Sequence, residues 1–554
     1  MISFCKKKNF LFKFSFFGFN KYILNSTIIY FLYLKKIQTK KGEIKMEYTL
    51  KPQEIGCLQT ILDTVSEQGV DMDITLPDYC PDIEKVLNCT FSPKIFTQNL
   101  SGGQLRVEGA VTVRVLYCDS VKKNVRCFEQ TSPFSAGFNV KDLTDQYGVI
   151  TSTKNEYINC RALSPRKLTV HGAFSLYAKI IGKGCFTAYG PGEDKTLCTK
   201  TRKISCMELS AFCQEQFTVT DEVSLEGRPP VESLLKSEVR ILSSQCKAVN
   251  GKIMLNGEIN MRLMYLSNFE TGDIEIVDYV TPYSQIINCE GVTETTVNHI
   301  NVNLMSGEVR LKGDAFSDHP LIVLDARICF TEMGYVPVDI TVIEDSYSTK
   351  FASTQQFTSM EFLKSTIPFR DTFMHKSTVK TDGASITKII DMECTPASSS
   401  FSVSEGIKAE GKFNCCITAI GDDGYPVYIE RIVDLQRDLS VEAGADNIEN
   451  LDFFINSMSY RIAEDDSIEL RCEIVMTGCA QLRETISGVN YIEISEDKPI
   501  EEDGCSLTLY YCDCGEKIWD IAKKYNTSED LIISENLLEG DRIDEAKMLL
   551  ITRI

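Results

Sequence analysis

Three stretches of the sequence decide the expected fold. They read Arg106-Val-Glu-Gly109-Ala-Val-Thr-Val-Arg-Val115, Ile253-Met-Leu-Asn-Gly257-Glu-Ile-Asn-Met-Arg-Leu263 and Ile407-Lys-Ala-Glu-Gly411-Lys-Phe-Asn-Cys-Cys-Ile417. Apolar and polar residues alternate in each stretch, which predicts strands that bury one face. The glycines recur at intervals of 148 and 154 residues. This spacing indicates three internal repeats of one unit.

Other features recur in register with these glycines. A shared pattern precedes them at residues 82–87, 230–235 and 385–390, and a second alternating run follows at 167–172, 308–313 and 467–472. Thr131-Ser-Pro133-Phe134 matches Thr281-Pro282-Tyr283, whereas the third copy lacks the proline. Because long helical periodicity is scarce, we expect a mainly β chain of three antiparallel sandwich or barrel-like repeats. The strand glycines are expected at bulges or at close approaches of the backbone.

The first repeat also contains Asp73-Ile-Thr-Leu-Pro-Asp-Tyr-Cys-Pro-Asp-Ile83, ahead of the strand at 109–117. Together these features resemble the SPOCS domain of SipL-type clostridial spore-coat morphogenetic proteins. The resemblance covers about residues 46 to 500. It predicts SPOCS-like repeats at 46–205, 206–360 and 361–494, followed by an acidic linker at 495–504.

The C-terminal residues 505–554 carry a different signature. They include Leu507-Thr-Leu-Tyr-Tyr-Cys-Asp-Cys-Gly515-Glu-Lys-Ile-Trp-Asp-Ile-Ala-Lys-Lys-Tyr525 and end Met548-Leu-Leu-Ile-Thr-Arg-Ile554. This stretch resembles a LysM module, a small α+β unit with the order strand, helix, helix, strand. Ile518, Ile521 and Ala522 fall on one face of the first helix, and Ser528-Glu-Asp predicts the start of the second. Glu516 is expected to accept N–H groups at the start of the first helix.

The LysM resemblance implies a binding site in two loops. LysM modules usually bind polymers of N-acetylglucosamine, and the corresponding residues here are Gly515, Glu516, Lys517, Ile518, Asn536, Leu537 and Leu538. Trp519, the only tryptophan, is either a core residue or a further contact. In SipL-type proteins the LysM is understood to bind SpoIVA, the ATPase of the coat basement layer, instead of glycan. Glu516-Lys517 stands where Asp-Thr is usual, and this departure argues against glycan recognition. The combination of the SPOCS and LysM resemblances favours the protein partner.

The first 45 residues differ in composition from the rest of the chain. They contain ten Lys and eight Phe, and Tyr22 begins an uncharged run of 13 residues that is too short to span a membrane. Residues 41–45 are compatible with a translated ribosome-binding sequence ahead of Met46. We therefore expect a mis-annotated leader or an N-terminal extension, with a signal or anchor as the alternative. Without these residues the chain has 48 basic and 77 acidic residues.

Charge and cysteine usage limit the classes of partner and cofactor. The net charge of −20 argues against nucleic acid as a partner. The 22 cysteines include no CxxC pair, so that reduced thiols are expected, with no metal and no cofactor. Cys512 and Cys514, and likewise Cys415 and Cys416, are interpreted as buried or surface thiols rather than metal ligands, with late oxidative crosslinking in an assembled coat as a further hypothesis. The acidic group of Asp73, Asp78, Asp82 and Glu84 is interpreted as the start of a helix at Pro81 rather than as a cation site.

The sequence predicts no enzyme, because GxxxxGK[ST], GxSxG and HExxH are all absent. The combined resemblances imply a scaffold of the endospore coat in the mother-cell cytoplasm at the forespore surface. Its expected partners are a SpoIVA-like coat ATPase and other spore-coat proteins, with no membrane span. The alternative is a cell-wall protein that binds peptidoglycan. A cleft with convergent polar side chains in one repeat would favour an enzyme.

Overall fold

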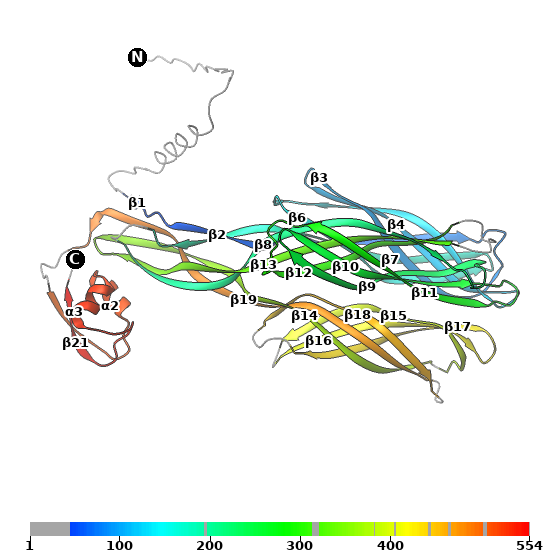
Figure 1. Ribbon diagram of the computed structural model, residues 1–554. Coiled ribbons are helices and arrows are strands. Elements are labelled where there is room, and N and C mark those ends of the chain that lie inside the picture. The colour runs from blue at the N-terminus through cyan, green and yellow to red at the C-terminus, as the bar shows by residue number, and fades with distance from the viewer. Residues whose placement is uncertain are drawn as a thin grey trace, which may run out of the picture.

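The computed structural model describes residues 45–192, 197–312, 321–381, 383–403, 406–440, 445–463, 467–501 and 507–552. This part of the chain consists of long antiparallel strands with two short helices near the C-terminus (Figure 1). The expectation of a mainly β chain is therefore confirmed. The leader predicted at residues 1–45, apart from Lys45, and linker residues 502–504 lie outside the described residues.

Six strands make up each of three consecutive repeats. The first repeat contains β2 (Lys51–Thr75), β3 (Ile83–Ser101), β4 (Gln104–Asp119), β5 (Val125–Asn139), β6 (Tyr147–Ser164) and β7 (Lys167–Gly190). The second contains β8 (Leu197–Ser224), β9 (Ser233–Val249), β10 (Lys252–Leu266), β11 (Ile274–Asn288), β12 (Val297–Lys312) and β13 (Leu321–Ser348). The third contains β14 (Phe351–Lys380), β15 (Ile386–Val403), β16 (Ile407–Gly421), β17 (Pro426–Leu439), β18 (Asn447–Ile462) and β19 (Ser467–Pro499).

The strands place the repeat boundaries between β7 and β8 and between β13 and β14. The predicted boundaries at 205/206 and 360/361 fall inside the first strands of the second and third repeats. Residues 495–499 of the predicted linker belong to β19. A further short strand, β1 (Lys45–Glu47), pairs with β19 at residues 493–495.

Each repeat folds into two sheets that face each other. The long first and last strands pair and are joined by the fifth, giving the orders β2-β7-β6, β8-β13-β12 and β14-β19-β18. The middle strands form the second sheets, β3-β4-β5, β9-β10-β11 and β15-β16-β17. Residues of both sheets share the apolar core of each repeat, for example Phe413 and Ile474 in the third, and the core of the first repeat divides into two clusters. Of the two expected architectures, the repeats adopt the sandwich.

The three glycine-containing runs are β4, β10 and β16, the central strands of these second sheets. Gly109 lies opposite Phe134, and a Cβ at position 109 would come within 2.1 Å of the Lys94 carbonyl oxygen. Gly257 lies opposite Tyr283 in the same way. The neighbouring strand has a register shift beside each of these glycines. Both expectations for the glycines, bulges and close approach, are thus confirmed.

The third repeat fills the space over its glycine differently. Gly411 lies opposite Leu435, which is smaller than the aromatic residues of the other two repeats. The ring of Phe453, from the facing sheet, covers the glycine, and a Cβ there would lie 2.9 Å from the ring. The missing Pro-aromatic motif is therefore compensated across the sandwich rather than along the sheet.

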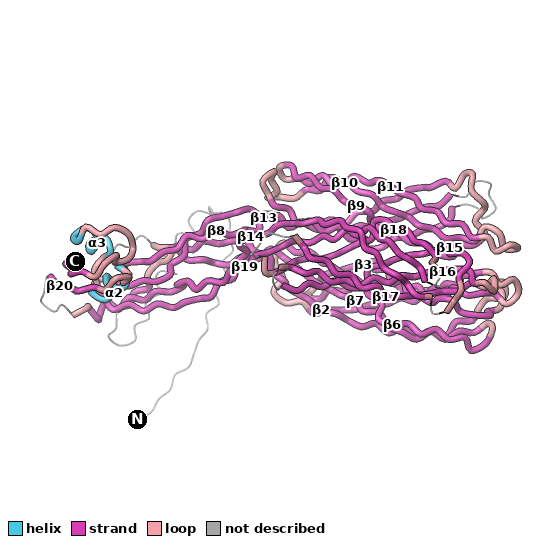
Figure 2. Tube along the Cα trace, turned by 90° about the horizontal axis from the view of Figure 1, so that it is seen from below, coloured by secondary structure: helices cyan, strands magenta, loops and turns pink. Residues whose placement is uncertain are grey.

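The paired long strands extend beyond the sandwiches and meet in a common stem. Its core contains residues of all three repeats, which are Ile55, Ala188, Ile204, Cys206, Ile340, Val342, Met360, Phe362 and Ile486. In Figures 1 and 2 the sandwiches lie side by side, and the narrower stem leads to the C-terminal module. No helix within the described ranges has the length and apolar character needed to cross a membrane.

Candidate functional site

The C-terminal module contains the loop residues predicted to bind a partner. It consists of β20 (Leu507–Cys512), α2 (Ile518–Tyr525), α3 (Glu529–Asn536) and β21 (Lys547–Thr552), in the predicted order. The two strands pair antiparallel, and both helices pack on one face of this sheet. The Ser528 side chain accepts a hydrogen bond from the Leu531 N–H at 3.3 Å, as expected for a helix start.

The first predicted loop is held against the chain that precedes β21. Gly515, at a φ of 89°, donates its N–H to the Ile543 carbonyl at 2.8 Å. The Ile518 N–H donates to the Asp541 carbonyl at 3.0 Å, and Lys517 forms a β-bridge with Arg542. The fold therefore brings residues 515–518 beside residues 541–543.

Glu516 does not act as the helix cap that the sequence predicts. Its carboxylate accepts a hydrogen bond from the Tyr510 hydroxyl at 3.1 Å. Lys517 occupies the N-cap position of α2 in an extended conformation, and its side chain makes no capping hydrogen bond. The prediction is wrong because the helix begins one residue later, which points the Glu516 side chain toward β20.

The second predicted loop divides into a structural and an exposed part. The Asn536 side chain donates to the Leu550 carbonyl at 2.7 Å and accepts from the Leu550 N–H at 2.6 Å, which ties α3 to β21. Leu538 is half-buried and its N–H donates to the Ile533 carbonyl at 3.1 Å. Leu537 has a φ of 50° and is 90% exposed, so that its side chain is open to contact.

Trp519 lies in the interface between the module and the second repeat. Only 5% of the residue is exposed, and its indole N–H donates to Asp345 Oδ2 at 2.8 Å. Its ring meets Tyr347 edge-on, with ring centroids 4.9 Å apart. Lys523 of α2 donates to the same carboxylate at 2.7 Å, and the Tyr347 hydroxyl donates to the Thr527 carbonyl at 2.6 Å. Asp345 and Tyr347, at the end of β13, therefore dock the module on the stem.

Burial by itself would raise the pKa of Asp345. Hydrogen bonds from Lys523, Gln355 and Trp519, together with the Lys523 charge, outweigh burial and lower this pKa. The docking carboxylate therefore stays ionised at neutral pH. Sequence reasoning did not find this contact, because Asp345 and Trp519 are 174 residues apart and no local pattern links them.

The outer face of the module's sheet carries an apolar patch. Leu507, Leu509, Tyr511 and Met548 are 51%, 64%, 64% and 60% exposed. Leu509 and Tyr511 lie opposite Leu550 and Met548 across the sheet. The outer face of a small antiparallel sheet is usually polar, so that an apolar face of this kind marks a contact surface. The alternation of residues along β20 indicates which side chains share this face, but sequence analysis uses these residues only to predict the fold of the module.

A cavity of about 530 Å³ lies where the three repeats meet. Its charged residues include Arg114 of the first repeat, Lys236 of the second and Asp391 and Glu393 of the third. Lys236 forms ion pairs with both Asp391 and Glu393. Lys236, Asp391 and Glu393 thus join the second repeat to the third, whereas Arg114 pairs with Glu129 of its own repeat.

The other predicted polar groups take part in local structure. Arg166 donates to Asp82 at 2.8 Å and to the Pro77 carbonyl at 2.6 Å. The chain at Pro81 leads into β3 and not into a helix, so that the predicted helix start is wrong. Cys512 and Cys514 donate to the Lys547 and Asp544 carbonyls. No group of three or more metal-binding side chains occurs among the described residues.

Comparison with family models identifies two of the repeats. The model described as SipL, SPOCS domain matches residues 82–163 and 230–311. These segments contain β3 to β6 of the first repeat and β9 to β12 of the second, apart from the last residue of β6 and of β12. The family model thus supports the SPOCS resemblance for two of the three predicted repeats. No curated protein and no solved structure gives a significant match.

Proposed function

We propose that this protein is a non-enzymatic scaffold of the endospore coat. In this proposal the C-terminal module, which resembles a LysM, docks on the SpoIVA-like ATPase of the basement layer around the forespore. The protein acts in the mother-cell cytoplasm, and its SPOCS repeats contact other coat proteins. The two SPOCS matches support a role in sporulation.

The observation that carries the docking role is the apolar outer face of the module's sheet. Trp519 already contacts Asp345 and Tyr347 within the molecule, whereas the side chains of Leu509 and Tyr511 are exposed to solvent. Residues 507–552 contain ten acidic and five basic residues. An apolar face in acidic surroundings suits a protein partner better than a neutral glycan, which is bound mainly through hydrogen bonds and ring stacking.

The test is the localisation of fluorescent fusions in sporulating cells. We expect the unmodified protein to encircle the forespore and the triple variant Leu509→Ser/Tyr511→Ser/Met548→Ser to become diffuse. The matched control is Val65→Ser/Leu163→Ser/Tyr177→Ser, which removes exposed apolar side chains from the first repeat. This control should still encircle the forespore.

Localisation of the unmodified protein at the vegetative wall or septum would contradict the coat role. Binding of the purified protein to peptidoglycan sacculi, lost on Lys517→Ala, would then support the cell-wall alternative. If fluorescence still encircles the forespore in the triple variant, docking takes place elsewhere on the molecule.

A further inference from the structure

The end of the molecule opposite the C-terminal module is built from three turns at equivalent places in the repeats. These turns connect β4 to β5, β10 to β11 and β16 to β17, at residues 119–124, 267–273 and 421–425. In Figure 1 the module and this end lie at opposite ends of the elongated molecule. We refer to the surface formed by these turns and by the adjoining loops 77–82 and 225–232 as the distal surface.

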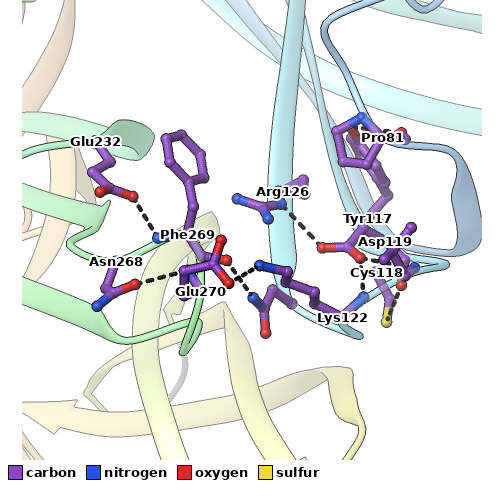
Figure 3. Close-up of polar contacts among 12 residues, drawn as sticks. Pro81, Tyr117, Cys118, Asp119, Lys122, Arg126, Glu232, Asn268, Phe269 and Glu270 are labelled. Carbon is purple, nitrogen blue, oxygen red and sulfur yellow. Dashed lines mark hydrogen bonds and ion pairs between the residues drawn. The ribbon is translucent and has the colours of Figure 1, made fainter.

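Asp119 fixes the shape of the first turn. It is 1% exposed, and its Oδ1 accepts hydrogen bonds from the N–H groups of Val121 at 3.0 Å and Lys122 at 2.6 Å. Its Oδ2 accepts from Arg126 Nε at 3.0 Å (Figure 3). With both oxygens engaged, the buried carboxylate holds the turn in one conformation.

The first turn contacts both of the others. Lys122 forms an ion pair with Glu270, and the Asn124 side chain donates to the Phe269 carbonyl at 3.2 Å. The Arg126 guanidinium lies 4.8 Å from the centre of the Phe269 ring, on the side of the first repeat (Figure 3). The ammonium group of Lys123 lies 5.4 Å from the centre of the Tyr425 ring. These contacts join the three turns into one surface.

Each turn presents an apolar side chain to solvent at this surface. Val121 is 74% exposed, Phe269 42% and Tyr425 38%. Tyr79, which is 84% exposed, belongs to the adjoining loop, whose Asp82 carbonyl accepts the Ser120 N–H at 2.9 Å. Val121 and Phe269 occupy equivalent positions in the first and second turns, and Tyr425 belongs to the third turn. None of these three side chains belongs to a sandwich core. Their convergence marks an interaction surface.

The net charge of the distal surface indicates the charge of the partner that it can bind. The three turns and two loops contain nine acidic and three basic residues. These bases are already engaged, since Lys122 pairs with Glu270, Lys123 with Glu84, and Arg228 donates to the Ile276 carbonyl. Arg126 and Arg166 beside the surface pair with Asp119, Asp78 and Asp82, and acidic residues still outnumber basic ones when these two arginines are included. We propose that the distal surface binds a protein segment in which apolar side chains stand among Lys and Arg. A second copy of this acidic chain, or an anionic membrane, would be repelled.

The inference does not depend on the docking proposed for the C-terminal module. To test it, p-benzoylphenylalanine replaces Tyr79 in the full chain, and the protein is photo-crosslinked in the cells that produce it. Mass spectrometry then identifies the linked peptide. We expect a Lys- or Arg-rich peptide of another protein that also carries apolar residues. The same photoreactive residue in place of Phe357, an exposed stem residue, is the position control.

Two variants separate the apolar and charged parts of the surface. Val121→Ser/Phe269→Ser/Tyr425→Ser should reduce the crosslink roughly tenfold or more, as expected for loss of an apolar anchor. Asp78→Lys/Asp422→Lys should reduce it while leaving the apolar residues in place. An unchanged melting temperature shows that the variants fold. A crosslink to an acidic peptide or to a second copy, equal crosslinking from position 357, or no crosslink would overturn the proposal.

Discussion

Glu332, on β13, is a carboxyl group fully buried in the second repeat. Neither of its oxygens has a hydrogen-bond partner among the described residues. Burial, reinforced by the Cys289 thiol, raises its pKa to about 9. The folded protein therefore binds a proton that the unfolded chain has already released at neutral pH.

This residue predicts a pH dependence of stability. Between the unfolded pKa of about 4.5 and the folded value, the folded state holds more protons, so that the free energy of unfolding falls as pH rises. Glu332→Gln removes this dependence and should stabilise the protein by about 3 kcal/mol at pH 7. Chemical unfolding at pH 5 and pH 7 measures the change, with the exposed Glu67→Gln as control. Equal pH dependence in the original and the variant would contradict the prediction.

At the scale of elements, the docking of α2 on β13 depends on few contacts. Trp519 is the only tryptophan in the chain, so that its fluorescence reports on this interface alone. We expect Asp345→Ala to shift the emission to longer wavelength, because the indole and Lys523 both lose their acceptor and water enters. Asp520→Ala, on the exposed side of the same helix, should leave the emission unchanged. If the Trp519 emission stays at short wavelength in both variants, apolar packing alone is enough to keep the module docked on β13.

The individual elements could be predicted from the sequence to different degrees. The alternation in β4 and the Ser528 cap follow from neighbouring residues, and both are confirmed. The Glu516 cap is wrong because the N-cap position of α2 falls on Lys517, and the Glu516 carboxylate accepts a hydrogen bond from Tyr510 of β20 instead. The helix at Pro81 is wrong because the following residues enter the sheet, where pairing with β4 outweighs local preference.

At the scale of the molecule, ion pairs bind the second repeat to the third. Arg262 of the second donates to Asp391 of the third at 2.7 Å, and the Asp391 side chain is only 6% exposed. Asp391→Ala removes a buried carboxylate that pairs with both Arg262 and Lys236, and should lower the free energy of unfolding by about 3 kcal/mol. Asp278→Ala removes a more exposed partner of Arg262 and should lower the free energy of unfolding by less than about 1 kcal/mol.

Thermal unfolding of the two variants measures this difference. We expect Asp391→Ala also to separate the unfolding of the second and third repeats into distinct transitions, because the buried carboxylate that pairs with both Arg262 and Lys236 is lost. Equal melting temperatures for the two variants would show that apolar contacts, rather than these ion pairs, couple the repeats.

The sequence by itself determined the class of fold, the threefold repetition, the central strands with their glycines and the order of elements in the C-terminal module. Each of these follows from the spacing of residues along one segment, which fixes local conformation and the face that is buried. Only the tertiary structure decided the common stem, the cavity between repeats, the docking of Trp519 and the distal surface. These features join residues more than a hundred positions apart, and the free energy of such contacts depends on how the repeats pack together rather than on local periodicity.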